Sequence, residues 1–239
     1  MGYPSPTAMP QSARLLVPNS VTAANIVVGF LSMLAAADGR FELAVYLLVL
    51  AVLLDTFDGP VARRLNATSK FGQEMDSFSD AVSFCVAPAF LAQRAMLQEL
   101  AGLGVVVSCL YLVAGVFRLV RFNLTSDVHH KARYAMGVPT PIGAGYVMAA
   151  VLMRDHISAP VGAVLVLIMA LLMISRLPLP QIQGRSLVTY AILVGIANYL
   201  VVVFRPNWYT IGWRNLWNVV ILILAKGEDR RLERAESST

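Results

Sequence analysis

The chain has 239 residues, of which 57% are hydrophobic and only 14% are charged, and its mean hydropathy is +0.66. A soluble domain carries about 25% charged residues, so this composition excludes an ordinary soluble protein and indicates an integral membrane protein. The net charge of +5 does not require a nucleic acid as partner, because a basic rim on a membrane protein is attracted to anionic lipid head groups.

Eight apolar runs follow one another, and we expect each to form a membrane-spanning helix. A spanning helix needs about 20 mostly apolar residues. The fifth run is short, and Arg214 interrupts the eighth. The predicted fold class is therefore all-α, a polytopic transmembrane helical bundle of about eight spans. The runs cover residues 20–37, 41–62, 74–93, 101–120, 141–153, 158–175, 187–204 and 208–225.

The distribution of basic residues predicts the orientation. If the N-terminus is cytoplasmic, 14 of the 19 Lys and Arg residues lie on the cytoplasmic side and five lie outside. Positive charge concentrates on the cytoplasmic side of membrane proteins, so we expect both termini in the cytoplasm. Residues 1–13, with several prolines, are expected to form a disordered tail. Residues 14–225 then form the transmembrane domain, and residues 226–239 form a charged cytoplasmic tail.

The first apolar run has an alternative interpretation as a secretory signal peptide, because Arg14 precedes it and small residues occupy 35–37. Polar residues interrupt its apolar stretch at Asn19, Thr22 and Asn25. We therefore expect it to be retained as a helix.

Acidic residues are concentrated in one short part of the chain. Five of the 14 lie between positions 55 and 80, at the inner ends of the second and third runs. A carboxylate in a spanning segment costs roughly 2.5–3.5 kcal/mol, so its presence indicates function. Asp55 and Asp58 are spaced i, i+3, and Asp76 and Asp80 are spaced i, i+4, so each pair shares a helix face. One aspartate at a helix end could simply reach interfacial water, but four in ordered spacing predict a site.

The polar segment from Arg63 to Phe71 is short enough to return the chain as an antiparallel neighbour. The two acidic faces would then meet, and their carboxylates would repel each other unless cations neutralise them. Oxygen ligands of this kind suit Mg²⁺, Mn²⁺ or Ca²⁺ better than Zn²⁺. We therefore expect a divalent metal centre here, of the kind that assists phosphoryl displacement.

Small residues surround the acids. Gly59, Ala62 and Gly72 leave room either for a ligand or for a closely packed helix, and both explanations stay open. Arg63 adds a fixed cation one turn beyond the carboxylates, which suits a diphosphate.

The whole constellation resembles a family signature. The pattern Asp55-x-x-Asp58-Gly59-x-x-Ala62-Arg63, eight residues, Gly72-x-x-x-Asp76-x-x-x-Asp80 is similar at every defined position to that of the CDP-alcohol phosphotransferase family. The resemblance implies two divalent ions, Mg²⁺ or Mn²⁺, held by the four aspartates, and Asp80 as the catalytic general base. It also implies a homodimer and a CDP-binding set consisting of Thr22, Asn25, Gly59, Ala62, Arg63 and Gly72.

Three flanking stretches resemble integral membrane phosphatidylserine synthases of bacteria. They lie within residues 17–30, 69–89 and 117–141. Cys85 stands where these enzymes often have Gly, and Val120 where they often have Ala. The resemblance implies CDP-diacylglycerol as donor and L-serine as acceptor, with the active site facing the cytoplasm at the plasma membrane.

Two arginines are candidates for binding the acceptor. Arg118 and Arg121 are spaced i, i+3, and a guanidinium is well shaped to hold the serine carboxylate. Asn123 and Thr140 could supply further polar contacts. Alternatively, the arginines only anchor a helix end among lipid head groups, and Asn123 and Thr140 only shape their loop.

Three other functions remain open. The same chemistry could use another acceptor, such as glycerol phosphate, inositol phosphate or choline, or serine with an archaeal ether-lipid donor. A cation transporter could also use buried aspartates. A transporter should show discontinuous helices in an internal repeat, whereas here no repeat is visible and the acids gather near one membrane face.

Overall fold

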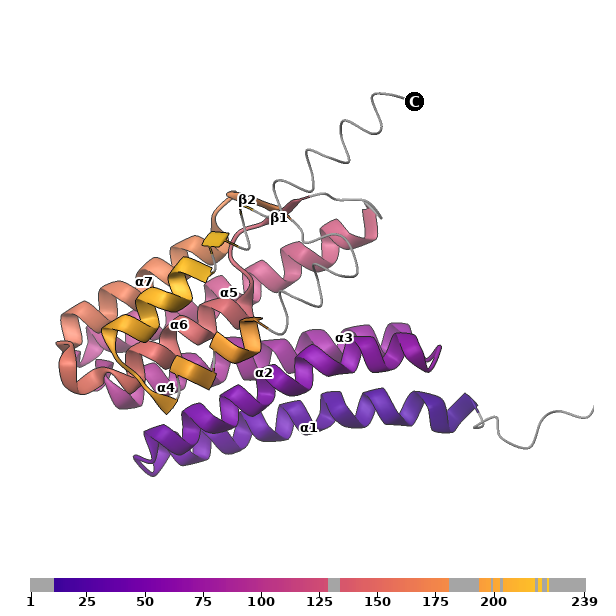
Figure 1. The fold of residues 1–239 in the computed structure, drawn as a ribbon, viewed down its shortest axis with the longest axis horizontal. Coiled ribbons are helices and arrows are strands. Elements are labelled where there is room, and N and C mark those ends of the chain that lie inside the picture. Colours follow the sequence, from indigo (N-terminus) through magenta and orange to yellow (C-terminus); the bar gives the residue numbers. More distant parts are fainter. Residues whose placement is uncertain are drawn as a thin grey trace, which may run out of the picture.

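The computed structural model describes residues 11–128, 134–180, 194–198, 200–202, 204–217, 219–220 and 223. Apart from one pair of short strands, these residues are mainly helical, which confirms the predicted all-α class (Figure 1). The α-helices are α1 (Gln11–Ala37), α2 (Phe41–Arg64), α3 (Lys70–Asp80), α4 (Ala87–Ala95), α5 (Gly102–Val128), α6 (Thr140–Leu152) and α7 (Ala159–Ile174). A π-helical segment, Ala81–Val86, joins α3 to α4, and short 3₁₀ turns occupy Leu97–Leu100 and Arg154–His156. Strands β1 (Tyr134–Met136) and β2 (Pro178–Pro180) pair antiparallel.

The first six apolar runs coincide with helices, and parts of the last two fall on helical residues beyond position 194. Helix α3 begins before its apolar run does, because Ser69 caps it by accepting a hydrogen bond from the backbone N–H of Gly72 at 3.0 Å. Most of the predicted N-terminal tail and all of the predicted C-terminal tail lie outside the described residues, and α1 already begins at Gln11.

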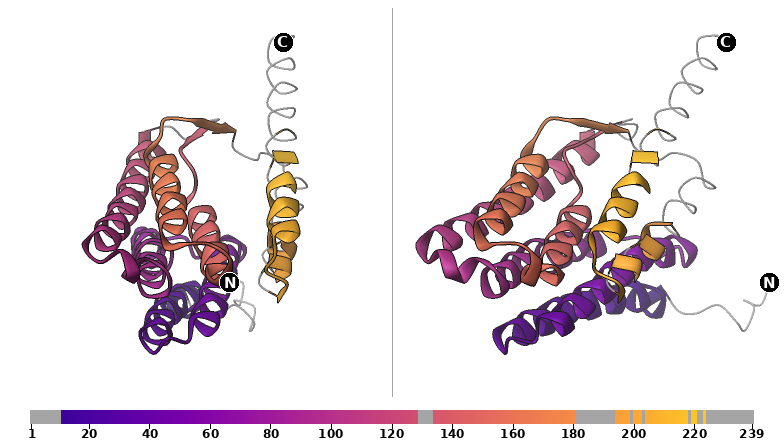
Figure 2. Two further views of the ribbon diagram at one scale, coloured as in Figure 1. Left: turned by 90° about the vertical axis from the view of Figure 1, so that its left-hand side faces the viewer. Right: turned by 60° about the vertical axis from the view of Figure 1, so that its left-hand side comes forward.

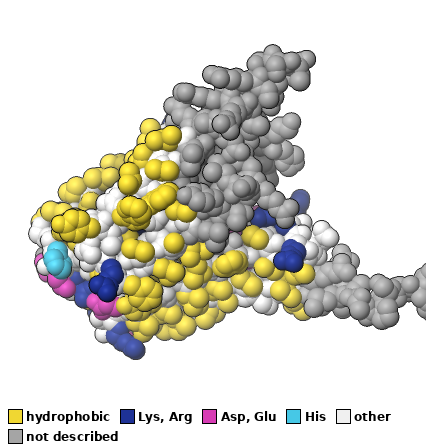
Figure 3. Space-filling view, viewed as in Figure 1, with side chains coloured by type: hydrophobic (Ala, Val, Ile, Leu, Met, Phe, Trp, Pro, Cys, Tyr) yellow, Lys and Arg dark blue, Asp and Glu magenta, His cyan; other side chains and the backbone are white. Residues whose placement is uncertain are grey.

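Among the described residues, two helices are long and apolar enough to cross a membrane, namely α1 over residues 15–37 and α5 over residues 102–124. Helices α6 and α7 are apolar but shorter. Hydrophobic side chains cover much of the described surface, and charged ones gather toward two ends (Figure 3). These features indicate a membrane protein, while the eight spans and the side of each terminus stay predictions.

The core lies where α2, α4, α5, α6 and α7 meet. Each helix contributes a large buried side chain: Leu48, Leu91, Tyr111, Met148 and Met173, respectively. Because lipid tails are as apolar as these side chains, close van der Waals packing is what holds such helices together in a membrane, and this layer holds the acidic ends of α2 and α3 in place.

The π-helical segment is inserted between two glycine faces. A Cβ atom on Gly29 of α1 would lie 2.5 Å from Ser83 Oγ, and one on Gly115 of α5 would lie 2.6 Å from Cys85 Sγ. Only glycine allows helices to approach this closely. The segment also begins directly after Asp80, and π-helical turns occur frequently at functional sites.

Arg214, the charged residue that interrupts the eighth apolar run, has contacts within the protein. Arg214 is buried, donates a hydrogen bond to the Gly145 carbonyl at 3.0 Å, and lies 4.0 Å from the ring centre of Tyr146. The Tyr146 hydroxyl in turn donates to Asn215. These contacts attach residues 208–217 to α6 on one side of the bundle (Figure 2), so the protein itself gives this cation a hydrogen bond and an aromatic contact.

Candidate active site

Three carboxylates meet at the ends of α2 and α3. Asp55, Asp76 and Asp80 each offer an oxygen that lies within 4.8 Å of the other two. Within the described residues, one oxygen of Asp76 and one of Asp80 are buried without a hydrogen-bond partner. Unpartnered buried carboxylate oxygens are costly, and like charges this close repel. The group therefore fits a divalent cation, which takes oxygen ligands of this kind. We call Asp55, Asp76 and Asp80 the acidic cluster.

The connection between α2 and α3 is tight, as its length predicts. Asn66 has a φ of 51°, a left-handed conformation that asparagine tolerates, and the backbone N–H of Ala67 donates to the carbonyl of Ala62 at 2.9 Å. The backbones of the two helices both pack on α1 more closely than on each other. Helix α1 is thus the platform of the site, and the acidic side chains of α2 and α3 approach each other beside it.

Asp58 lies outside the group of three but beside it. It is 7% exposed, and its Oδ2 accepts a hydrogen bond from the hydroxyl of Thr22 on α1 at 3.1 Å. The structure therefore brings together three of the four predicted metal ligands and ties the fourth to the platform helix.

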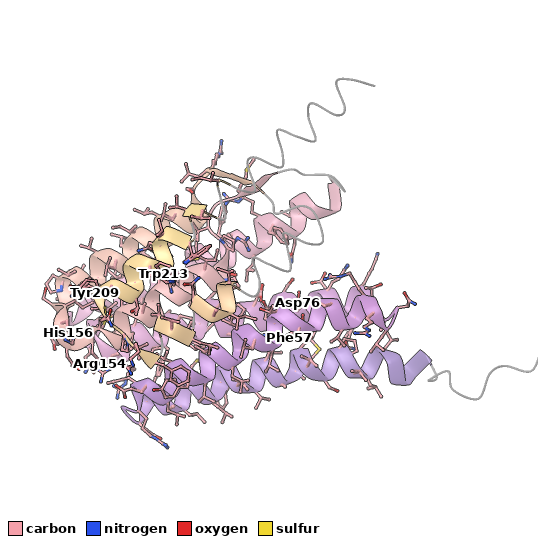
Figure 4. All side chains as sticks on the ribbon, in the orientation of Figure 1. Phe57, Asp76, Arg154, His156, Tyr209 and Trp213 are labelled. Carbon is pink, nitrogen blue, oxygen red and sulfur yellow. The ribbon has the colours of Figure 1, made fainter. Side chains whose placement is uncertain are left out.

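A pocket of about 200 Å³ adjoins the acidic cluster. It lies between α1, the end of α2 and the start of α3, and Asp76 is among its lining residues. In Figure 4 Asp76 lies far from Arg154 and His156, which are at the other end of the bundle. Its lining includes five of the six residues predicted to hold CDP, namely Thr22, Gly59, Ala62, Arg63 and Gly72, together with Asp58 and Asp76.

The sixth predicted CDP residue, Asn25, does not line the pocket. It is fully buried, and its Oδ1 accepts a hydrogen bond from the hydroxyl of Ser83 at 2.8 Å. Asn25 therefore joins α1 to the π-helical segment that follows Asp80, and its participation in CDP binding stays a prediction.

The geometry distinguishes the two explanations for the small residues, namely room for a ligand and close packing of a helix. A Cβ atom on Gly59 would meet only the flexible end of Arg63, at 3.4 Å. One on Gly72 would lie 3.3 Å from both Asn19 Oδ1 and Ser69 Oγ. None of these contacts involves the backbone of a neighbouring helix, so the glycines favour space for a ligand over close helix packing.

Sequence reasoning missed several polar residues of the pocket, of which Asn19, Ser69 and Gln73 are examples. Asn19 precedes Thr22 by three residues on the same face of α1. For Asn19 the signal was present in the polar residues that interrupt the first apolar run, of which Asn19 and Thr22 line the pocket.

The four predicted acceptor residues have different surroundings. Arg118 is 7% exposed, its Nε is buried without a partner among the described residues, and it is close enough to Asp80 for the two charges to attract. Thr140 is fully buried, and its hydroxyl also lacks a partner within the described part of the chain. Asn123, by contrast, is exposed and donates to Ser77 Oγ at 2.9 Å.

Arg121 is already engaged with backbone carbonyls. Its guanidinium donates to the carbonyl oxygens of Met136 at 2.7 Å, Ile174 at 2.9 Å, Ser175 at 3.0 Å and Met173 at 3.1 Å. The structure thus gives the two predicted arginines different environments, and Arg118 is the one whose charge interacts with Asp80 of the acidic cluster.

Thr140 lies at the level of the acidic cluster. Ala51 of α2, Phe84 of the π-helical segment and Ala144 of α6 form a small buried cluster. Asp55, Asp80 and Thr140 are each four residues from one of these three, and residues four apart in a helix lie on one face. In each of the three elements, the residue four positions away lies toward the same end of the bundle. This is the end where Arg121 contacts Met136 and Asn123 contacts Ser77.

Comparison with known proteins bears on this site. The model of the CDP-alcohol phosphatidyltransferase family matches residues 15–179. A CDP-diacylglycerol–serine O-phosphatidyltransferase of Helicobacter pylori is 37% identical over 147 residues, and the alignment covers 62% of this chain and 62% of that protein. A protein of the same name from Mycobacterium leprae is 30% identical over an alignment of 232 residues, and the alignment covers 91% of this chain and 76% of the relative. An archaetidylserine synthase of Methanothermobacter thermautotrophicus is 32% identical over 172 residues, with 71% of this chain and 72% of the relative covered.

The family match spans the platform helix, the acidic cluster, the pocket and the acceptor candidates, and it confirms the resemblance carried by the aspartate pattern. The chain belongs to the CDP-alcohol phosphatidyltransferase family.

Proposed function

We propose that this protein transfers a phosphatidyl group from CDP-diacylglycerol to L-serine, giving phosphatidylserine and CMP. The observation that carries the proposal is the buried acidic cluster of Asp55, Asp76 and Asp80 beside a pocket that contains Arg63 and two glycines. This combination supports binding of a metal-complexed diphosphate, and two of the relatives are named for the serine reaction.

The pocket supplies the donor side of the site. Arg63 and the glycine faces of Gly59 and Gly72 accommodate the diphosphate of the donor, and Thr22 and Ala62 complete the wall. A guanidinium binds phosphate oxygens with more than one hydrogen bond, which fixes their orientation.

The unpartnered oxygens of Asp76 and Asp80 support a role as metal ligands, together with Asp55 and with Asp58 at the pocket edge. Two ions of Mg²⁺ or Mn²⁺, when bound there, neutralise the diphosphate and the negative charge that develops on the departing CMP.

Asp80 is the general base. It accepts the proton of the serine hydroxyl, whose oxygen forms a bond to the phosphorus that carries diacylglycerol. The bond from this phosphorus to the bridging oxygen breaks, and its electron pair leaves with CMP. Arg118, whose charge interacts with that of Asp80, holds the serine carboxylate, and the Thr140 hydroxyl, buried without a partner among the described residues, supplies a further polar contact.

A second candidate keeps serine but changes the donor to an archaeal CDP-linked ether lipid. The relative named archaetidylserine synthase supports it, being 32% identical over 71% of this chain. A phosphorylated acceptor is less well supported, because Arg118 is the basic residue that the described structure buries beside Asp80, and an added phosphate would call for more cations.

We further propose that the site faces the cytoplasm of the plasma membrane in a protein with eight spans, and that two copies form a homodimer among membrane lipids. The charge distribution supports the orientation.

One assay tests the proposed function directly. Membranes that contain the protein receive CDP-diacylglycerol and, in separate reactions, serine, glycerol phosphate, inositol phosphate or choline, and CMP release is measured. A parallel series replaces the donor with its ether-linked counterpart. We expect release with serine alone; release with another alcohol in preference to serine would reassign the acceptor.

A further inference from the structure

Arg121 connects three parts of the chain that are far apart in sequence. Its guanidinium, on α5, donates to the carbonyl of Met136 at the end of β1 and to three carbonyls at the end of α7, those of Met173, Ile174 and Ser175. The last carbonyls of a helix have no partner within the helix and carry partial negative charge, so a cation is favourable there. A single guanidinium therefore caps α7 and binds β1 at the same time.

The residues after β1 lie between Arg121 and α7. Gly137 has a φ of 76°, and its backbone N–H donates to the carbonyl of Leu177 at 3.0 Å. A Cβ atom on Gly137 would lie 2.8 Å from the Arg121 guanidinium and would also collide with the carbonyl of Met173. The next backbone N–H, of Val138, donates to Leu172 at 3.2 Å. This turn, Met136–Val138, is held on both sides.

The turn leads directly into α6. Pro139 precedes the helix and Thr140 is its first residue. The Thr140 hydroxyl is buried without a partner among the described residues, and Thr140 lies one helical turn from Ala144, which shares a small buried cluster with Phe84. Any shift of the turn would therefore move a buried hydroxyl relative to Asp80 and Arg118.

We propose that Arg121 is a positioning residue, which holds the Met136–Val138 turn against the end of α7 and thereby places Thr140 in the acceptor site. The statement that Thr140 belongs to the acceptor site rests on the proposed function. The effect of Arg121 on the turn does not depend on that function. It also differs from a direct contact between Arg121 and serine, because the guanidinium acts here through backbone carbonyls.

The test combines two measurements on purified protein in lipid nanodiscs. Hydrogen–deuterium exchange of residues 134–140, without substrates, reports whether the turn is held. Steady-state CMP release reports kcat/KM for serine and KM for CDP-diacylglycerol. The variants are Arg121→Lys, Arg121→Gln, Gly137→Ala and Thr140→Val, and Arg176→Gln serves as the control because Arg176 is exposed near the same helix end.

Both Arg121 variants and Gly137→Ala are expected to exchange faster at residues 136–138, and their kcat/KM for serine should fall about 10- to 100-fold, as small misplacements do. The KM for CDP-diacylglycerol should change less than about twofold, because the donor pocket contains none of these residues. Lys should fail to restore the turn, since one ammonium cannot reach four separated carbonyls. Thr140→Val should show the same serine defect with normal exchange, and Arg176→Gln should match the unmodified protein.

Normal exchange in the Arg121 variants together with a serine defect would make Arg121 a direct ligand and overturn the proposal. Faster exchange with unchanged serine kinetics would overturn the link to Thr140. If the unmodified protein released no CMP with serine, the proposed function would fail, whereas the exchange data would still decide the role of Arg121 in the turn. Thermal unfolding shows whether each variant folds. If a more severe variant does not fold, Arg121→Lys, the mildest substitution, is compared with the unmodified protein.

Discussion

The hydroxyl of Thr22 on α1 donates a hydrogen bond to the carboxylate of Asp58 on α2 at 3.1 Å, and both residues line the pocket. This bond joins the platform helix to the helix that carries two of the four site aspartates. Hydrogen bonds to charged groups contribute roughly 1.5–3 kcal/mol, so the contact can hold Asp58 in one orientation.

The first prediction follows from that bond. Thr22→Val keeps the shape of the side chain and removes its donor. We expect kcat/KM for CDP-diacylglycerol to fall about tenfold or more, because about 1.4 kcal/mol corresponds to a factor of ten, while the KM for serine changes little. Ser20→Ala is the matched control, since Ser20 is exposed and its hydroxyl donates to the carbonyl of Leu16 in its own helix. Unchanged donor kinetics in Thr22→Val would show that the bond has no part in binding.

Metal dependence is the second prediction. Excess chelator should abolish CMP release, and Mg²⁺ or Mn²⁺ should restore it, because the acidic cluster otherwise lacks counter-charge. A separate readout is thermal unfolding, since a ligand at 100 times its Kd stabilises the folded state by about 2.7 kcal/mol. The rise in Tm with Mg²⁺ should be lost in Asp76→Asn. Full turnover in excess chelator would exclude the metal mechanism.

The third prediction separates binding from chemistry at Asp80. Asp80→Asn keeps the shape and one ligand oxygen but cannot accept the serine proton. General-base catalysis contributes about 10²–10⁴-fold, so CMP release should fall by that factor while labelled CDP-diacylglycerol still binds, more weakly. A variant that keeps most of its turnover would assign the base to another group.

The fourth prediction concerns Arg118. Arg118→Lys preserves the charge, and with it any anchoring among lipid head groups, but loses the planar fork that grips a carboxylate. We expect a raised KM for serine and an unchanged KM for CDP-diacylglycerol. Arg94→Lys is the control, because Arg94 is exposed and contacts the carbonyl of Ala37 at 3.1 Å. Equal loss of affinity for both substrates would indicate a contact with the diphosphate instead.

The acidic cluster and most of the pocket could be predicted from sequence because their signals are local. Spacings of three and four residues place Asp55 with Asp58, and Asp76 with Asp80, on single helix faces. The length of the intervening segment then limits how far apart the pairs can lie. The order of the helices along the chain was predictable for the same reason, from continuous apolar runs.

The platform role of α1 and the different roles of the two arginines were not predictable in this way. Arg118 and Arg121 have equivalent spacing and chemistry in the sequence. Three of the four carbonyls that engage Arg121 lie about fifty residues further along the chain, and a backbone carbonyl leaves no residue-specific signal. The π-helical segment depends likewise on Gly29 and Gly115, which approach it only in the folded protein.

The π-helical segment also lies between two parts of one continuous helix that must face different neighbours. A π-helical turn corresponds to one extra residue in an α-helix, and one residue rotates everything beyond it by about 100°. The stretch before Ala81 presents Asp76 and Asp80 to the cluster, while the stretch after Val86 presents Leu91 to the core. Deleting a single residue between them would leave either the carboxylates or the core face misdirected. Length at this point is therefore as constrained as residue identity, and related chains should tolerate substitution between Ala81 and Val86 more readily than deletion.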